Sequence, residues 1–342
     1  MRHPARVRLK PLAEQVVVIT GASSGIGLAT ARLAARRGAR LVLASRNEAA
    51  LKAVCEELQA QGREALYVVA DVANEDDLRR VAGAALERFG GFDTWVNNAG
   101  VTIYGRVEDV GIADAKRLFE TNFWGVFHGS RIAVEHLRER GGALINVGSD
   151  LSEHAVPLMG VYSASKHAVM GLTDALRVEL ERARAPVSVT LVRPSGIDTQ
   201  IVPHAKNYMD EAPSLPPPVY APQVVARAIL HAAGHPTRDL FAGAAARVLA
   251  TVTHFLPRTS DWILRRLVWG QLHSGRPRLA GPDGLHASAG GPPRERFGGP
   301  ALVFRRSLYT TLARHPMAVR AAALLAGAAL FAAFSARRRL SR

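Results

Sequence analysis

The chain has 342 residues, a formal net charge of +15 and a single cysteine, Cys55. This length allows one large domain with an appendage, and the single cysteine excludes an intrachain disulfide framework and fits a reducing compartment. Residues 236–342 contain 17 Arg and four acidic residues, whereas residues 11–235 contain 23 Lys or Arg and 25 acidic residues. The basic tail carries no recognised nucleic-acid-binding motif, so we expect no nucleic-acid partner and favour an anionic membrane surface.

The first strong pattern is an apolar, β-branched run at residues 15–20, typical of a buried parallel strand. It leads directly into a glycine-rich turn and then a helix that ends near Gly38, the context of a dinucleotide-binding loop. Gly21 would allow the tight turn, Gly25 would let the backbone approach a pyrophosphate, and Gly27 would let the helix pack close to the sheet. The free N–H groups at the start of the helix would bind phosphate; a glycine-rich turn without a ligand is the alternative.

A second strand is predicted at residues 40–45, and it ends in Ser45-Arg46. In this fold an acidic residue at that strand end would bind the ribose 2′-hydroxyl of NAD, whereas an arginine accommodates the 2′-phosphate of NADP. No acidic residue precedes Arg46, and a guanidinium suits phosphate. The sequence therefore predicts NADP(H), with a solvated surface arginine as the alternative.

Strands continue to alternate with helices along the chain. Further strands are expected at residues 65–70, 94–98, 143–148, 187–193 and 239–242. Further helices are expected at about residues 48–61, 75–89, 112–140 and 222–234, together with a helix that carries Tyr162 and Lys166 and continues to about residue 184. This alternation predicts an α/β fold with a Rossmann-like, doubly wound parallel sheet and helices on both faces.

Candidate catalytic residues lie on and beside the helix that follows the strand at 143–148. Tyr162 and Lys166 are four residues apart, so on a helix they share a face, and a nearby cation favours the tyrosinate. Ser149 follows the strand directly and could hold a carbonyl oxygen while Tyr162 protonates it. Without further motifs, a tyrosine and a lysine at this spacing are more often a partly buried tyrosine and a solvated lysine with no catalytic role.

Taken with the motifs Thr20-Gly-Ala-Ser-Ser-Gly-Ile-Gly27 and Asn97-Asn-Ala-Gly100, these residues make positions 15–243 resemble the short-chain dehydrogenase/reductase family. The resemblance implies four catalytic residues: Asn122, Ser149, Tyr162 and Lys166. It implies that Asn122 positions Lys166 through water and that Lys166 also binds the nicotinamide ribose. The cofactor-binding residues that we expect are Gly21, Ser23, Ser24, Gly25, Ile26, Gly27, Ser45, Arg46, Asp71, Val72, Asn98, Ala99, Gly100, Tyr162, Lys166, Pro194, Ile197 and Thr199.

One departure from the family pattern is Pro194-Ser195-Gly196, where many members have Pro-Gly directly. Residues 200–220 occupy the position of the family's substrate lid, in which His204 and Tyr208 would pack rather than catalyse. The resemblance and the apolar tail predict an apolar carbonyl or alcohol substrate, such as a lipid, steroid or retinoid-like molecule, with small xenobiotic carbonyls as the alternative. A homo-oligomer is usual in the family. A non-catalytic, membrane-associated NADP-binding scaffold or redox sensor is the rival function.

The remaining segments differ in character from the catalytic domain. Residues 1–14 form a basic N-terminal segment, 244–274 an amphipathic helical extension, 275–300 a Gly/Pro/Arg-rich linker, and 301–342 a C-terminal segment with an apolar helix at 317–336. His286 has no neighbouring ligands at metal spacing, so no metal is proposed. We expect a cytoplasmic active site and membrane association through residues 244–342; a tail folded onto the domain or a dimer partner is the alternative.

Overall fold

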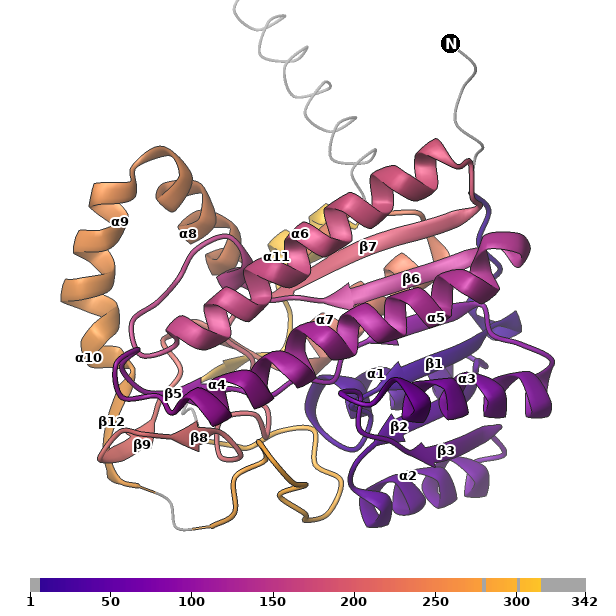
Figure 1. Ribbon diagram of the computed structural model, residues 1–342, viewed down its shortest axis with the longest axis horizontal. Coiled ribbons are helices and arrows are strands. Elements are labelled where there is room, and N and C mark those ends of the chain that lie inside the picture. The colour runs from indigo at the N-terminus through magenta and orange to yellow at the C-terminus, as the bar shows by residue number, and fades with distance from the viewer. Residues whose placement is uncertain (1–6, 279–280, 300–301, 315–342) are drawn as a thin grey trace, which may run out of the picture.

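The computed structural model describes residues 7–278, 281–299 and 302–314 (Figure 1). Its centre is a seven-stranded sheet in the order β11-β7-β6-β4-β1-β2-β3, and every neighbouring pair is parallel. The strands are β1 (Val16–Thr20), β2 (Arg40–Ser45), β3 (Ala65–Val69), β4 (Thr94–Asn97), β6 (Gly142–Val147), β7 (Val187–Pro194) and β11 (Asp239–Ala242). The predicted fold class is confirmed.

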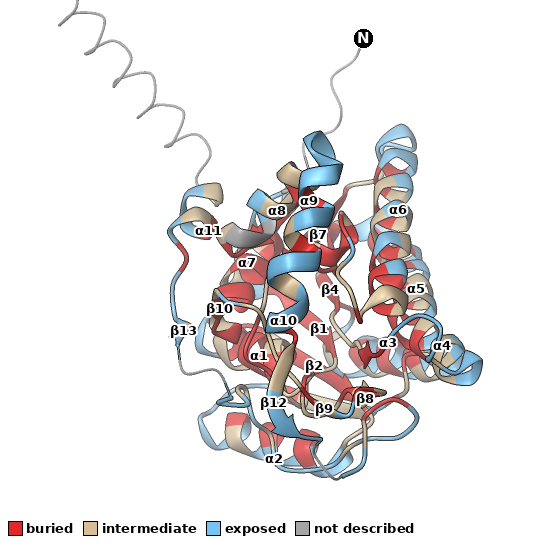
Figure 2. Cartoon of the chain, turned by 90° about the vertical axis from the view of Figure 1, so that its left-hand side faces the viewer, coloured by how far each residue is buried: buried red, intermediate tan, exposed pale blue. Residues whose placement is uncertain are grey.

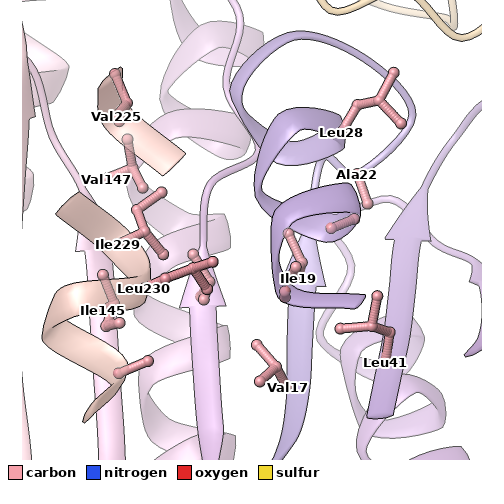
Figure 3. Packing of buried hydrophobic residues seen from close by; sticks show 14 of the residues in the cluster. Val17, Ile19, Ala22, Leu28, Leu41, Ile145, Val147, Val225, Ile229 and Leu230 are labelled. Carbon is pink, nitrogen blue, oxygen red and sulfur yellow. The ribbon is translucent and has the colours of Figure 1, made fainter. Parts of the chain in front are cut away.

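Helices cover both faces of the sheet because its strands are apolar on both sides. One face packs against α1 (Gly25–Arg36), α2 (Glu48–Ala60) and α7 (Pro222–Gly234). Figure 3 shows side chains of β1, α1 and α7 in this layer. The other face packs against α3 (Glu75–Phe89), α5 (Gly125–Arg140) and α6 (Gly160–Arg182). Buried residues accordingly concentrate on the strands and the inner sides of these helices (Figure 2).

A chain of buried hydrogen bonds crosses the second layer. The indole N–H of Trp95 donates to Asn97 Oδ1 (2.8 Å), and Asn97 Nδ2 donates to Asn146 Oδ1 (2.9 Å). Asn146 Nδ2 donates in turn to Thr173 Oγ1 (2.9 Å). These bonds join β4 and β6 to α6, where a buried polar group without a partner would cost about 1–3 kcal/mol. They fix the position of α6 relative to the sheet.

The helical region expected at 112–140 contains an irregularity. It is divided into α4 (Ile112–Phe119), a π-helical turn η2 (Glu120–Trp124) and α5. Asn122 lies within this turn and is fully buried. Single π-turns inside α-helices often occur at functional sites, because they redirect side chains.

Residues 200–220, which we expect to form the lid, and the C-terminal extension are joined by short strand pairs. β5 (Ile103–Tyr104) pairs with β8 (Lys206–Asn207) of the lid. The other lid strands, β9 (Glu211–Pro213) and β10 (Val219–Tyr220), pair with β12 (His273–Pro277) and β13 (Val303–Phe304) of the extension. The extension therefore holds two parts of the lid.

Residues 281–299, for which composition predicts a linker, are packed against the domain. Leu285 is completely buried, and Arg296 Nε contacts Asp198 Oδ2 at 2.6 Å. Membrane association and folding onto the domain were the two alternatives for the tail, and this segment is folded onto the domain. Long-range packing of this kind leaves no periodic pattern in a Gly/Pro-rich sequence.

Four helical elements precede this segment and stand beside the sheet (Figure 1). They are α8 (Ala244–Phe255), α9 (Pro257–Ile263), η4 (Leu264–Val268) and α10 (Trp269–Gln271), and α11 (Leu308–Ala313) follows near the end. Among the described residues, none of the helices has the length and apolar character needed to cross a bilayer. The apolar helix expected at 317–336 lies outside the described residues, as do residues 1–6 of the basic N-terminal segment.

Candidate active site

Two adjoining cavities lie at the carboxyl edge of the parallel sheet, where ligands bind in such folds. The first, of about 420 Å³, is lined by the glycine loop and Arg46. The second, of about 280 Å³, is lined by Ser149, Tyr162 and Lys166. Ile26, Asn98, Gly100, Thr199 and Ile201 line both cavities. A ligand in the first cavity could therefore reach a ligand in the second.

The glycine loop is held by contacts that only glycine permits. A Cβ on Gly27 would lie 2.2 Å from the Gly21 carbonyl oxygen, and one on Gly21 would lie 2.8 Å from the Ala99 Cα. Gly21 also has a φ of +66°, which favours glycine. Asn98 Nδ2 donates to the Thr20 carbonyl oxygen at 2.9 Å, and this bond joins the ends of β1 and β4. The loop thus leads directly into the start of α1, where backbone N–H groups without intrahelical partners can bind phosphate; the first of them, the Gly25 N–H, bonds the Arg294 carbonyl oxygen.

Arg46 lies at the other end of the first cavity. Its guanidinium donates to the carbonyl oxygens of Gly284 and Leu285, the latter at 3.2 Å. Burial lowers the Arg46 pKa. Nearby, Asp71 forms an ion pair with Arg117. This end of the cavity therefore carries a guanidinium group whose donors bond carbonyl oxygens of the C-terminal extension.

The second cavity brings the candidate catalytic residues together. Tyr162 and Lys166 lie on the first turns of α6, and Lys166 Nζ is 5.7 Å from the centroid of the Tyr162 ring. Lys166 Nζ donates to the Val147 carbonyl oxygen at 3.1 Å. Ser149 caps a short 3₁₀ turn, η3 (Asp150–Ser152), and its Oγ accepts from the Leu151 N–H at 3.1 Å. All three side chains are at least nine-tenths buried.

Burial dominates the proton affinities in this cavity. It raises the pKa of the Tyr162 phenol, Asp150 raises that pKa further, and a hydrogen bond with Ser149 opposes the shift. Burial also lowers the pKa of Lys166 to about 8. We expected Lys166 to lower the pKa of Tyr162, but desolvation of the phenolate exceeds any such effect in this structure. The phenol is therefore protonated at neutral pH, as a proton donor must be.

Asn122 lies behind the cavities and lines neither of them. Its Oδ1 accepts from the Val101 N–H and its Nδ2 donates to the Val101 carbonyl oxygen, both at 2.9 Å. Nδ2 also approaches Ser165 Oγ at 3.1 Å. A Cβ on Gly100 would lie 3.4 Å from Asn122 Oδ1 and 3.7 Å from Lys166 Nζ. Asn122 therefore fixes the backbone of Val101, the residue after Gly100, beside Lys166.

The other residues expected from the sequence line one cavity or the other, except Gly27, which packs beneath its loop. The first cavity is lined by Gly21, Ser23, Ser24, Gly25, Ile26, Ser45, Arg46, Asp71, Val72, Asn98, Ala99, Gly100 and Thr199. Pro194 and Ile197 line the second.

Several residues of the site were not expected from the sequence. Asp150 accepts from Ser149 Oγ at 2.9 Å, and burial raises the Asp150 pKa to about 6. The position of Asp150 directly after Ser149 was the sequence signal that could have identified it. His154 is buried in the second cavity, where its ring nitrogens have no hydrogen-bond partner within the described chain and burial lowers its pKa to about 4. Leu249, Val268 and Leu272 of the extension also line this cavity.

A nicotinamide dinucleotide fits the first cavity. The glycine loop and the cationic Arg46 both line it. Thr121 lines the same cavity, and its hydroxyl is a buried polar group with no hydrogen-bond partner among the described residues. Together with the phenol, hydroxyl and ammonium of the second cavity, this arrangement can exchange a proton with an oxygen next to a hydride donor or acceptor.

Comparison with known proteins identifies relatives and similar structures. A family model of short chain dehydrogenases matches residues 15–209. An uncharacterized oxidoreductase, YxnA, from Bacillus subtilis is 43% identical over 96% of this chain and 92% of its own length. An 11-beta-hydroxysteroid dehydrogenase A from Sesamum indicum is 34% identical, covering 74% of this chain and 75% of that protein.

Two solved structures share the fold. A short-chain dehydrogenase/reductase from Burkholderia phymatum in complex with NAD has a TM-score of 0.67 at 29% identity, covering 75% of this chain and 97% of that one. An alcohol dehydrogenase from the archaeon Thermococcus sibiricus, complexed with 5-hydroxy-NADP, has a TM-score of 0.58 at 30% identity, covering 66% and 95%. The similar structures thus include complexes with both kinds of nicotinamide cofactor.

Replacing Gly27 by Ala tests the glycine loop. The added methyl group would lie 2.2 Å from the Gly21 carbonyl oxygen, and relieving such overpacking costs about 1–3 kcal/mol. We expect nicotinamide dinucleotide binding, measured by fluorescence titration, to weaken by about tenfold. Gly83→Ala in α3 is the control, because its Cβ would meet nothing within 4 Å. Unchanged binding by Gly27→Ala would contradict this account of the loop.

Proposed function

Because the chain belongs to the short-chain dehydrogenase/reductase family, we propose that it is an NADP-dependent oxidoreductase that interconverts a carbonyl and an alcohol on an apolar substrate. The observation that carries the proposal is the grouping of Tyr162, Lys166 and Ser149 in a cavity that adjoins the glycine-loop cavity.

The residues have separate roles in the reducing direction. The cofactor supplies the hydride. Tyr162 gives its proton to the substrate oxygen, and Ser149 hydrogen-bonds that oxygen. Lys166 is charged below about pH 8, holds the nicotinamide ribose and stabilises the tyrosinate that forms when the proton leaves. Asn122 keeps the backbone next to Lys166 in place and holds the proton relay.

The apolar substrate is supported by the lining of the second cavity. Met159, Leu215, Leu249, Val268 and Leu272 contribute apolar side chains to it. The 34% identical relative is named for a hydroxysteroid, which is a bulky apolar alcohol. A small xenobiotic carbonyl remains the alternative substrate, and a non-catalytic NADP-binding scaffold remains the alternative function.

Replacing Tyr162 by Phe removes the transferable proton and keeps the ring. We expect the turnover of an apolar ketone with NADPH to fall by about 10²–10⁴-fold, while NADPH still binds. Tyr67→Phe on β3 serves as the control and should retain turnover. Full turnover by Tyr162→Phe would refute the mechanism, and tight NADPH binding without turnover of any carbonyl by the wild-type chain would support the scaffold.

Replacing Arg46 by Ala tests the preference for NADP. Charge-assisted hydrogen bonds contribute about 1.5–3 kcal/mol each, so NADPH binding should weaken by about tenfold or more while NADH binding changes little. Titration of both cofactors into both proteins measures this difference. Equal affinity of the wild-type protein for the two cofactors, or tighter NADH binding, would contradict the proposal.

We also propose that α8–α10 contact an anionic membrane surface. Phe255, Trp262 and Leu267 are 72%, 52% and 54% exposed, and Arg265 and Arg266 lie among them. Figure 2 shows the exposed side of α9 and α10. Apolar and aromatic side chains interspersed with arginine are typical of a helix that binds the bilayer interface.

Cosedimentation with phosphatidylglycerol/phosphatidylcholine vesicles tests the membrane proposal. Changing Phe255 and Trp262 together to Ser should reduce the bound fraction strongly, since burying each ring contributes about 1.5–3 kcal/mol. Val178→Ser is the control, because Val178 is 59% exposed on α6. If the wild-type chain stays in the supernatant at low salt, and gel filtration shows an oligomer that the double variant loses, this face is an interface between copies of the chain.

A further inference from the structure

Residues 281–299 of the C-terminal extension, here called the strap, cross the cavity that the glycine loop lines. Gly284, Ser288, Gly291 and Arg294 contribute to its lining. These residues lie well beyond the stretch that the family model matches. The cavity therefore has one wall from the family domain and a second wall from the strap.

The strap is fixed to the domain on the side of Arg46. Leu285 is completely buried, and the Gly284 N–H donates to the His204 carbonyl oxygen at 2.7 Å. The carbonyl oxygens of Gly284 and Leu285 accept from Arg46. Asn47 Nδ2, next along the chain, donates to the Gly291 carbonyl oxygen at 3.1 Å.

The strap is fixed again beyond the cavity. Glu295 forms an ion pair with Arg32 of α1 at 2.9 Å. Arg296 Nε contacts Asp198 Oδ2 at 2.6 Å, and Asp198 Oδ1 also accepts from the N–H groups of Phe297 (3.2 Å) and Gly298 (2.9 Å). The side chain of Asp198 is completely buried by these contacts. Both ends of the crossing are therefore anchored.

Arg294 lies between these anchors, at the start of α1. The Gly25 N–H donates to the Arg294 carbonyl oxygen at 3.0 Å, so the backbone of Arg294 is held at the start of the helix. Arg294 is exposed and is one of the residues that line the cavity. A dinucleotide diphosphate at this helix start would lie beside a cation on the strap as well as the amides of the glycine loop.

We propose that the strap is the outer wall of the cofactor site and that Arg294 supplies a positive charge to the cofactor diphosphate. This inference rests on the proposed function, because it requires a nicotinamide dinucleotide in the first cavity. It differs from the role of Arg46, because the diphosphate is common to NADP and NAD whereas the 2′-phosphate is not.

The opposite arrangement is a strap that competes with the cofactor. The carbonyl oxygens of Gly284 and Leu285 use donors of Arg46 that a 2′-phosphate would also use. A competing strap predicts that loosening it tightens cofactor binding. If the strap is instead a wall of the site, loosening the strap should weaken cofactor binding and speed cofactor release.

Full-length protein carrying Arg294→Gln provides the first test, with Arg182→Gln on the exposed end of α6 as the matched control. We expect the dissociation constants of NADPH and NADH to rise together, each by about tenfold, with a reduced dependence on salt. Arg46→Ala should instead raise only the constant for NADPH. Unchanged binding of both cofactors by Arg294→Gln would overturn the role of Arg294.

Leu285→Ala provides the second test, with a thermal melt to show that the domain remains folded. Stopped-flow release of NADPH should be about tenfold faster, because the strap loses its buried anchor. Slower release or tighter binding by Leu285→Ala would overturn the wall and identify a competing strap. A wild-type protein that binds neither cofactor would refute the proposed function itself, whereas normal wild-type binding with unaffected variants refutes only this inference.

Discussion

The buried hydrogen bonds from Trp95 through Asn97 and Asn146 to Thr173 are the constraint on which the site depends. An amide that loses its buried hydrogen-bond partner is strongly penalised, because it cannot turn to water instead. These bonds fix α6 in one register against β4 and β6. The register in turn decides which turn of α6 faces the end of β6, and so whether Tyr162 and Lys166 meet Ser149.

Much of the sheet and of the candidate site could be predicted from the sequence, because the motifs that indicate them are short and continuous in the chain. The glycine loop, Ser149 and the Tyr162–Lys166 pair follow or adjoin strands, and parallel strands bring their carboxyl ends to one edge. The strap could not be predicted, because its contacts join Arg32 to Glu295 and Arg46 to Leu285 across most of the chain. The proton affinity of Tyr162 also required the structure, since the sequence places a lysine nearby but does not report how deeply the phenol is buried.

The extension takes part in both cavities. It pairs with two of the lid strands, lines the second cavity with Leu249, Val268 and Leu272, and crosses the first. Residues outside the stretch that the family model matches thus help to line both cavities. Relatives that share only the domain are therefore poor guides to the specificity of this chain.

The order in which the chain is synthesised gives the strap a further consequence. Arg46 and Leu285 are 239 residues apart, so at about 5–20 residues per second the nascent chain spends on the order of 10–50 s with the glycine loop made and the strap still to come. Domains begin to fold as they emerge. Within that interval the last residues on the domain side of the cavity, Thr199 to His204, are also made before the strap. The strap is therefore the last part of the cavity to be synthesised.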